Sequence, residues 1–244
     1  MIIPARFNGP AGSANGGYAA GLFAQAWPAA RSVTGVTDPP VRVTLRRPPP
    51  LDTPLRAVPV TPVRLRIEVD RTGSADDSGL VAEVEQVDTP LGPPVAPVSP
   101  RRAVAAGAAY PGFSAHPFPS CYVCGPRHPD GLRIFPGPVG DGRVAAPFLV
   151  PASTTVATVW AALDCPGGWA VLAPGRPYVL GRMTATVATP PVPGQRCVVV
   201  GELVAASGRK AEVRTALYDP TGGVLGQARA TWIAVAAPDA GAPA

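Results

Sequence analysis

Apolar and polar residues alternate along much of this chain, and the alternation predicts strands in a sheet with one face in water. Residues 64–69 are the clearest case, because arginine or glutamate takes every second position and an aliphatic residue takes the next. Proline and glycine separate such segments. The pattern predicts strands at 41–45, 63–69, 80–87, 178–189, 196–205, 210–218 and 224–234, with ordered structure also at 132–135 and 143–150.

Two stretches of small residues interrupt the alternation, and we expect a helix in each. The first covers residues 15–27, with Asn15 as a good N-cap and Pro28 as the residue that ends the helix. The second covers about 155–165 and continues or restarts across Pro166. Both stretches are apolar all round, which fits helices that a sheet wraps.

A four-residue phrase occurs once in each half of the chain, as Gly16-Gly17-Tyr18-Ala19 and as Gly167-Gly168-Trp169-Ala170. Each copy lies in a helix-prone stretch that strand-like sequence follows, and this order favours an internal duplication in an α+β protein. The predicted division is a first half at 1–110, an inter-half segment with Cys-x2-Cys at 111–131, a second half at 132–238 and a disordered tail at 239–244.

The composition is that of a globular protein with a proper core. Of the 244 residues, 46% are hydrophobic and 15% are charged, which excludes a disordered chain. The 34 prolines exclude long uninterrupted helices, because each proline removes an amide donor and clashes with the preceding turn. Four cysteines in a chain of this length do not indicate the disulfide framework of a small secreted protein.

The net charge of +5 comes from dispersed arginines and a single lysine, Lys210. Two interpretations stay open: a compositional preference for arginine, or a surface that attracts an anionic ligand such as a phosphorylated cofactor. Nucleic acid is not an expected partner, because the chain has no basic run and no recognised module. No apolar stretch approaches the ~20 residues that span a bilayer, and residues 1–6 lack the charged lead and apolar run of a secretory signal. We therefore expect a cytoplasmic protein without a membrane partner.

Three segments of the chain resemble the hotdog-fold thioesterases, in which an antiparallel sheet wraps one central helix. Residues 15–22 (Asn-Gly-Gly-Tyr-Ala-Ala-Gly-Leu) look like the family's His-Gly-Gly start of that helix, with Asn15 in place of histidine, and are similar to the Gly-Gly-Gln opening of type-II acyl-CoA thioesterases. Residues 161–168 look like the later part of the motif, an Asp followed by Gly, and 121–126 with 130–132 resemble a phrase common before the first strand. The resemblance implies a double hotdog, with two curved antiparallel sheets that each wrap one central helix.

In this family a site forms between two hotdog units, with a glycine from one unit and an acid from the other. Within one unit the acid follows the glycine by about eight residues, a little over two helical turns. Ala24 stands at that distance after Gly16, and Val156 stands at that distance before Asp164. Each half thus keeps a different part of the motif. The resemblance therefore implies one composite site with Gly16 and Asp164, and a second, inactive arrangement with Val156 and Ala24.

The resemblance implies catalytic roles for Gly16, Asp164 and Asn15. The N–H of Gly16, with that of Gly17, holds the oxyanion at the start of a helix, while Asp164 activates water and Asn15 orients the carbonyl. Asp164 is also the one acid of an apolar stretch, where an unpaired carboxylate is costly to bury. Substrate-binding residues are expected at Gly17, Tyr18, Trp160, Gly167 and Gly168, although packing alone also explains the two aromatic residues. The implied reaction is hydrolysis of an acyl thioester of coenzyme A or of a carrier protein, without a cofactor, in a chain that can form a homo-oligomer.

Two other functions stay open. A hotdog hydratase or dehydratase uses a histidine paired with an acid for proton transfer, and the only histidines, His116 and His128, both lie between the halves. A non-catalytic acyl-binding protein is the other alternative, because type-II enzymes pair their Asp with a Thr and a Gln. The spacing of Thr184, Thr186 and Gln227 does not place any of them convincingly in that role.

The two histidines flank the Cys-x2-Cys motif in the order His116, Cys121, Cys124, His128, and such ligands can form a tetrahedral zinc site. We nevertheless expect no metal, because these ligands crowd into one short segment and the similar phrase in the family normally holds none. A redox pair is less favoured still, since that motif usually stands at a helix start in a thioredoxin-like unit. Cys165 has no histidine close in sequence to serve as its base, and we interpret it as a small core residue.

Overall fold

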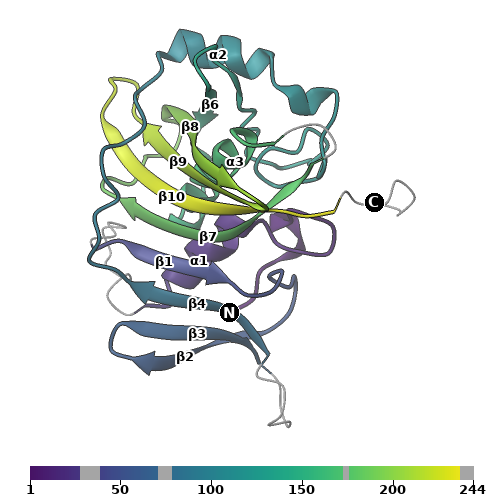
Figure 1. Cartoon of the computed structure of the whole chain (residues 1–244), viewed down its shortest axis with the longest axis vertical. Helices are drawn as coiled ribbons and strands as arrows, with labels where there is room; N and C mark the ends of the chain where they lie inside the picture. Colours follow the sequence, from purple (N-terminus) through teal and green to yellow (C-terminus); the bar gives the residue numbers. More distant parts are fainter. Residues whose placement is uncertain (28–38, 71–78, 173–175, 237–244) are drawn as a thin grey trace.

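A computed structural model describes residues 1–27, 39–70, 79–172 and 176–236 of the protein, so the predicted tail at 239–244 lies outside the described residues. The strands form one antiparallel ten-stranded sheet in the order β2-β3-β4-β1-β7-β10-β9-β8-β6-β5 (Figure 1). Four of these strands come from the first half of the chain: β1 (Val41–Leu45), β2 (Leu55–Thr61), β3 (Arg64–Val69) and β4 (Leu80–Gln86). Six come from the second half: β5 (Gly137–Pro138), β6 (Arg143–Leu149), β7 (Tyr178–Val187), β8 (Arg196–Ser207), β9 (Lys210–Tyr218) and β10 (Val224–Ala234).

The strands of the two halves meet where β1 pairs with β7. Val41 lies opposite Ala185 and Val43 lies opposite Met183, and all four side chains are buried. The prediction of two sheets is therefore corrected to one continuous sheet. The physical reason is that an edge strand leaves a row of unpaired N–H and C=O groups, and joining β1 to β7 satisfies two such rows at once.

Helices α1 (Gly16–Ala24) and α3 (Val156–Trp169) lie on the same side of the sheet and pack against each other (Figure 1). Side chains begin both helices: Asn15 Oδ1 accepts a hydrogen bond from the N–H of Tyr18, and Thr155 forms a capping box with Thr158. Helix α3 continues through Pro166 without a restart. None of the helices in the described part of the chain is long and apolar enough to cross a bilayer.

Two glycines one turn apart allow α1 and α3 to touch along their backbones. A Cβ atom on Gly17 would lie 2.3 Å from Cβ of Asp164. One on Gly21 would lie 2.7 Å from both Cα of Ala157 and Cβ of Trp160. Real Cβ atoms do not approach other atoms this closely, so only glycine fits at either position. The small-residue character of the first helix thus brings its first turn into contact with Asp164.

A third helix, α2 (Pro100–Ala108), lies in the proline- and alanine-rich stretch that carries no strand pattern. Although residues 1–110 are predicted to belong to the first half, α2 and the segment before it cover the outer face of β6, β8 and β9 in the second half. This small second core consists of Val95, Val98, Ala103, Ala145, Val198, Val200, Ala216 and Tyr218. Two short 3-10 helices, Ala5–Phe7 and Pro111–Phe113, complete the helical elements of the described residues, and 132–135 forms no strand.

The contact between α1 and α3 gives a stability prediction. Gly21→Ala should lower the free energy of unfolding by about 3 kcal/mol, because the added methyl group meets backbone of α3 that cannot move aside. In a chain of this size that loss corresponds to a decrease in Tm of roughly 6–12 °C, measurable by circular dichroism.

Gly107→Ala in α2 is the matched control. A Cβ atom there would lie 3.2 Å from Cδ of Pro147, a contact that a small shift relieves, and alanine favours the helix by up to about 1 kcal/mol. Equal stability of Gly21→Ala and the wild type would contradict the backbone contact.

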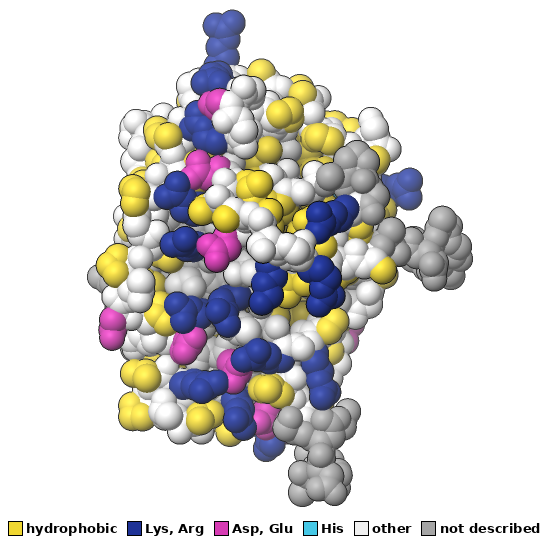
Figure 2. Space-filling model, viewed as in Figure 1, with side chains coloured by type: hydrophobic (Ala, Val, Ile, Leu, Met, Phe, Trp, Pro, Cys, Tyr) yellow, Lys and Arg dark blue, Asp and Glu magenta, His cyan; other side chains and the backbone are white. Residues whose placement is uncertain are grey.

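Many of the arginines lie on strands of the sheet. Figure 2 shows basic and acidic side chains interleaved down one face of the molecule. Cross-strand ion pairs join Arg42 to Glu85 at 3.2 Å and Arg56 to Glu68 at 3.1 Å, and Glu83 joins both Arg46 and Arg64. Exposed pairs of this kind contribute little to stability. They account for many of the dispersed arginines as components of a solvated sheet face.

Candidate active site

A cavity of about 360 Å³ opens where the first turn of α1 meets the second half of α3. Its walls come from the loop before α1, the loop after β1, the inter-half segment, the end of α3, and the ends of β7 and β10. Most of the lining surface is apolar, with a few polar groups, as in sites for small organic ligands. Both halves of the chain therefore contribute to the same cavity.

One N–H group in the first turn of α1 has no partner in the described part of the chain. The N–H of Tyr18 donates to Asn15 Oδ1 at 2.9 Å, and the N–H of Ala19 donates to the Asn15 carbonyl at 3.0 Å. The N–H of Gly17 donates to Asp164 Oδ2 at 2.8 Å. The N–H of Gly16 has no acceptor among the described residues, and Gly16 lines the cavity. A helix N-terminus with a free N–H is a favourable place for a negatively charged oxygen.

Asp164 is buried, only 2% exposed, and one of its two oxygens is held in place. Its Oδ2 accepts hydrogen bonds from the N–H of Gly17 at 2.8 Å and from Nδ2 of Asn15 at 3.3 Å. Its Oδ1 has no hydrogen-bond partner within the described structure. Burial raises the pKa of Asp164 to about 7, although the bond from Gly17 opposes the shift. The carboxyl group is thus oriented, its second oxygen is buried without a partner, and Asp164 lies in the cavity lining.

The structure brings Asn15, Gly16 and Gly17 of the first half beside Asp164 of the second half. The resemblance to hotdog thioesterases implies this arrangement, with the glycines from one half and the acid from the other. The catalytic roles of these residues stay a prediction. Val156 begins α3 as Gly16 begins α1, and Ala24 provides no carboxyl group at the corresponding place on α1.

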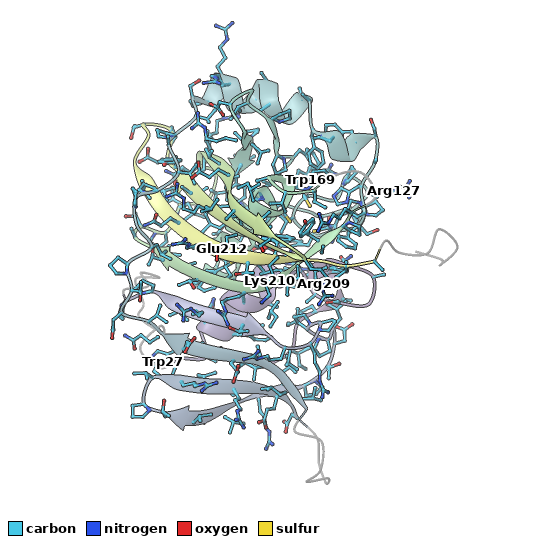
Figure 3. All side chains as sticks on the ribbon, in the orientation of Figure 1. Trp27, Arg127, Trp169, Arg209, Lys210 and Glu212 are labelled. Atoms are coloured by element: carbon cyan, nitrogen blue, oxygen red, sulfur yellow. The ribbon has the colours of Figure 1, made fainter. Side chains whose placement is uncertain are left out.

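The predicted substrate-binding residues divide into two groups. Gly168 lines the cavity, and so does Trp169, the last residue of α3 (Figure 3). Four predicted residues lie outside the lining: Gly17, Tyr18, Trp160 and Gly167. Tyr18 stacks on Phe7 with ring centroids 3.8 Å apart, and Trp160 is fully buried. A ligand in the cavity would therefore contact the end of α3. Tyr18 and Trp160 instead pack in the core, which was the alternative role given to them by the sequence.

The polar partners used by type-II enzymes are not at this cavity. Thr184, Thr186 and Gln227 lie on β7 and β10, and none of these three described side chains lines it. The Thr184 hydroxyl instead accepts a hydrogen bond from Arg42 Nε at 3.4 Å on the sheet. Asn15 supplies the side-chain hydrogen bond to Asp164, and cysteines of the inter-half segment line the same cavity. The resemblance did not indicate that this segment contributes to the site.

The four candidate zinc ligands of the inter-half segment do not converge. His128 Nε2 lies 2.7 Å from the carbonyl oxygen of Arg6, and its Nδ1 accepts a hydrogen bond from the N–H of Asp130. His116 and both cysteines of the motif line the cavity instead, together with Cys165. Cys165 belongs to the buried core, as interpreted from the sequence, and its Sγ also lies 3.9 Å from that of Cys121. No motif connects these two cysteines in the sequence.

Comparisons with known proteins identify the fold. No protein-family model matches the sequence, and no curated protein matches it. A protein of unknown function with a hot dog fold from Alicyclobacillus acidocaldarius superposes with a TM-score of 0.57 and 13% identity, over 95% of this chain and 90% of that one. The tesB protein of Mycobacterium avium subs paratuberculosis superposes with a TM-score of 0.54 and 14% identity, over 96% of this chain and 91% of that one. The chain therefore has the hotdog fold.

Proposed function

We propose that this hotdog protein hydrolyses acyl thioesters of coenzyme A or of a carrier protein at the cavity between α1 and α3. The observation that carries the proposal is the position of Asp164, whose Oδ2 is held by Gly17 and Asn15 while Oδ1 stays unpaired next to a free helix N-terminus. An oriented carboxylate and a helix N–H group in the lining of one cavity are what attack of water on a carbonyl requires.

In the proposed reaction the thioester carbonyl oxygen accepts a hydrogen bond from the N–H of Gly16. Asp164 Oδ1 takes a proton from a water molecule as the water oxygen bonds to the carbonyl carbon, and negative charge develops on the carbonyl oxygen. The carbon–sulfur bond then breaks, the proton passes from Asp164 to the departing thiolate, and a carboxylic acid and a free thiol leave. Asn15 holds the carboxylate in a fixed position relative to the first turn of α1, because it forms a hydrogen bond to each of them.

We further propose that the two halves are two hotdog units fused through β1 and β7, with one working site between them. The repeated order of a helix followed by strands supports this interpretation, as does the contribution of α1 and α3 to one cavity. The apolar lining suits an acyl chain, and the positive charge of Arg46 and Arg47 in the lining suits an anionic carrier, with Arg46 also paired to Glu83. The fold similarity to the tesB protein agrees with this assignment.

Two alternatives have support of their own. The missing Thr and Gln partners favour a protein that binds acyl thioesters without cleaving them. The position of His116 in the lining favours a hydratase, but both of its ring nitrogens are engaged: Nδ1 accepts from the N–H of Phe118 at 2.9 Å, and Nε2 lies 3.2 Å from the Cys124 carbonyl. A proton-transfer role for His116 would require that these bonds break.

Thiol release from a panel of acyl-coenzyme A esters of increasing chain length, and from an acylated carrier protein, tests the proposal. We expect the best substrate to reach a kcat/KM of at least about 10⁴ M⁻¹s⁻¹, the lower part of the range for enzymes on their natural substrates. A thiol-reactive dye measures the release.

Binding without thiol release would contradict hydrolysis and favour the binding protein. Tryptophan fluorescence can measure it with a non-hydrolysable thioether analogue of acyl-coenzyme A, because Trp169 lines the cavity. Consumption of a 2-enoyl thioester without thiol release would identify the hydratase.

A further inference from the structure

Three cysteines from two distant parts of the chain converge beside the cavity. Cys121 and Cys124 belong to the inter-half segment and Cys165 belongs to α3, and their three Sγ atoms all lie within 4.8 Å of one another. The Sγ atoms of Cys121 and Cys165 are 3.9 Å apart. Each residue is 4% exposed. Neither the fold nor the proposed hydrolysis requires three thiols at one point.

The backbone of the Cys-x2-Cys motif forms a tight turn that brings both of its cysteines to the cluster. The N–H of Gly125 closes the turn on the Cys121 carbonyl at 2.8 Å. A Cβ atom on Gly125 would lie 2.4 Å from the Cys121 nitrogen, so only glycine permits this tight turn. The turn thus fixes the backbone on which Cys121 and Cys124 stand close to Cys165.

Side chains supply donors to the same cluster. Asn15 Nδ2 lies 3.7 Å from Cys121 Sγ and 3.8 Å from Cys165 Sγ, and His116 Nε2 lies 3.4 Å from Cys124 Sγ. Each of the three sulfurs thus has a side-chain nitrogen within hydrogen-bond distance. Sulfurs that receive several N–H groups carry negative charge more readily, and metal-bound thiolates are commonly supported in this way.

We infer that Cys121, Cys124 and Cys165 bind a zinc ion through three thiolates, with a fourth position open to the cavity. Zn–S bonds of about 2.3 Å at tetrahedral angles place the sulfurs about 3.8 Å apart, and the Cys121–Cys165 separation is 3.9 Å. Binding of Zn²⁺ displaces the three thiol protons to solvent, and no oxidant or reductant takes part. Thiolate ligands select zinc over magnesium or calcium, which prefer oxygen.

His116 does not supply the fourth ligand in this arrangement, although its Nε2 lies 3.4 Å from Cys124 Sγ. Its Nδ1 accepts a hydrogen bond from the N–H of Phe118. In a neutral imidazole the other nitrogen, Nε2, then carries the proton and cannot coordinate a metal. The fourth position is therefore left to water or to a ligand atom in the cavity, which all three cysteines line.

A zinc ion here would tie the inter-half segment to α3 at the residue next to Asp164. The ion would hold the cavity wall in place whether or not the protein hydrolyses thioesters. The inference is thus independent of the proposed function, and a metal measurement tests it without an activity assay.

Metal analysis of the full-length protein, purified under reducing conditions with zinc present and then desalted, is the test. We expect about one zinc per chain in the wild type, and less than about 0.2 in Cys121→Ser, Cys124→Ser and Cys165→Ser. Cys197→Ser is the matched control, because Cys197 is equally buried but lies on β8 outside the cluster; it should keep its zinc. His116→Gln should also keep it, and loss of zinc in that variant would overturn the three-thiolate assignment.

A second measurement needs no variant, so a failure of the serine variants to fold cannot obscure the result. Addition of Co²⁺ to the reduced wild type should produce near-ultraviolet charge-transfer absorption of the strength expected for three Co–thiolate bonds, and Zn²⁺ should abolish it. A wild type that retains no zinc and shows no such absorption with Co²⁺ would overturn the inference.

Discussion

Asp164→Asn is expected to lower kcat for thioester hydrolysis by about 10²- to 10⁴-fold, the usual contribution of a positioned general base. Asparagine keeps the shape of the side chain and an oxygen that accepts from Gly17 and Asn15. It cannot take a proton from water. The loss should appear in kcat, with KM for the acyl thioester changed little, because Asp164 acts on water and not on the acyl chain. Thiol release under saturating substrate measures the effect.

The fold of Asp164→Asn should survive, since a neutral amide is less costly to bury than a carboxylate. A Tm equal to or above that of the wild type would establish this. Asp141→Asn is the matched control: this acid lies on the surface and pairs with Arg143, far from the cavity lining, and its loss should leave kcat unchanged. Full activity in Asp164→Asn would remove Asp164 from the mechanism.

The second large effect concerns the N–H of Gly16. Gly16→Pro deletes that N–H and should lower kcat by about 10²- to 10³-fold, as the loss of one oxyanion donor does in other enzymes. Proline suits the first position of a helix. The residue before it, Asn15, already has the extended φ of −59° and ψ of 130° that a following proline prefers. The backbone can therefore accept the substitution while losing the donor.

Gly16→Ala is the matched control for this experiment. In both variants a Cβ atom would lie 2.8 Å from Cβ of Leu180, so both share this packing cost, and alanine keeps the N–H. The difference in kcat between the two variants isolates the donor. Equal activities would show that Gly16 does not hold the oxyanion, whatever the role of Asp164.

Local sequence patterns predicted most of the individual elements. Strands β1, β9 and β10 have their predicted bounds, because alternation of side chains and flanking turn residues are local properties of the chain. Strand β2 was missed because Pro59 interrupts it, and proline is tolerated there only because β2 is the outermost strand of the sheet. Helix α2 was missed because its buried face consists of alanine and glycine, whose hydrophobic signal is weak.

The sequence by itself determined most of the strands, the two central helices and the division of glycine and acid between the halves, since each depends on residues close together in the chain. Only the tertiary structure decided that β1 pairs with β7, that Asp164 receives the N–H of Gly17, and that Cys165 meets Cys121. These contacts join residues far apart in sequence, and close packing of α1 on α3 through glycine creates the contact between Gly17 and Asp164. Periodicity and spacing carry no information about such distances, which is why the three-cysteine cluster has no counterpart in any motif.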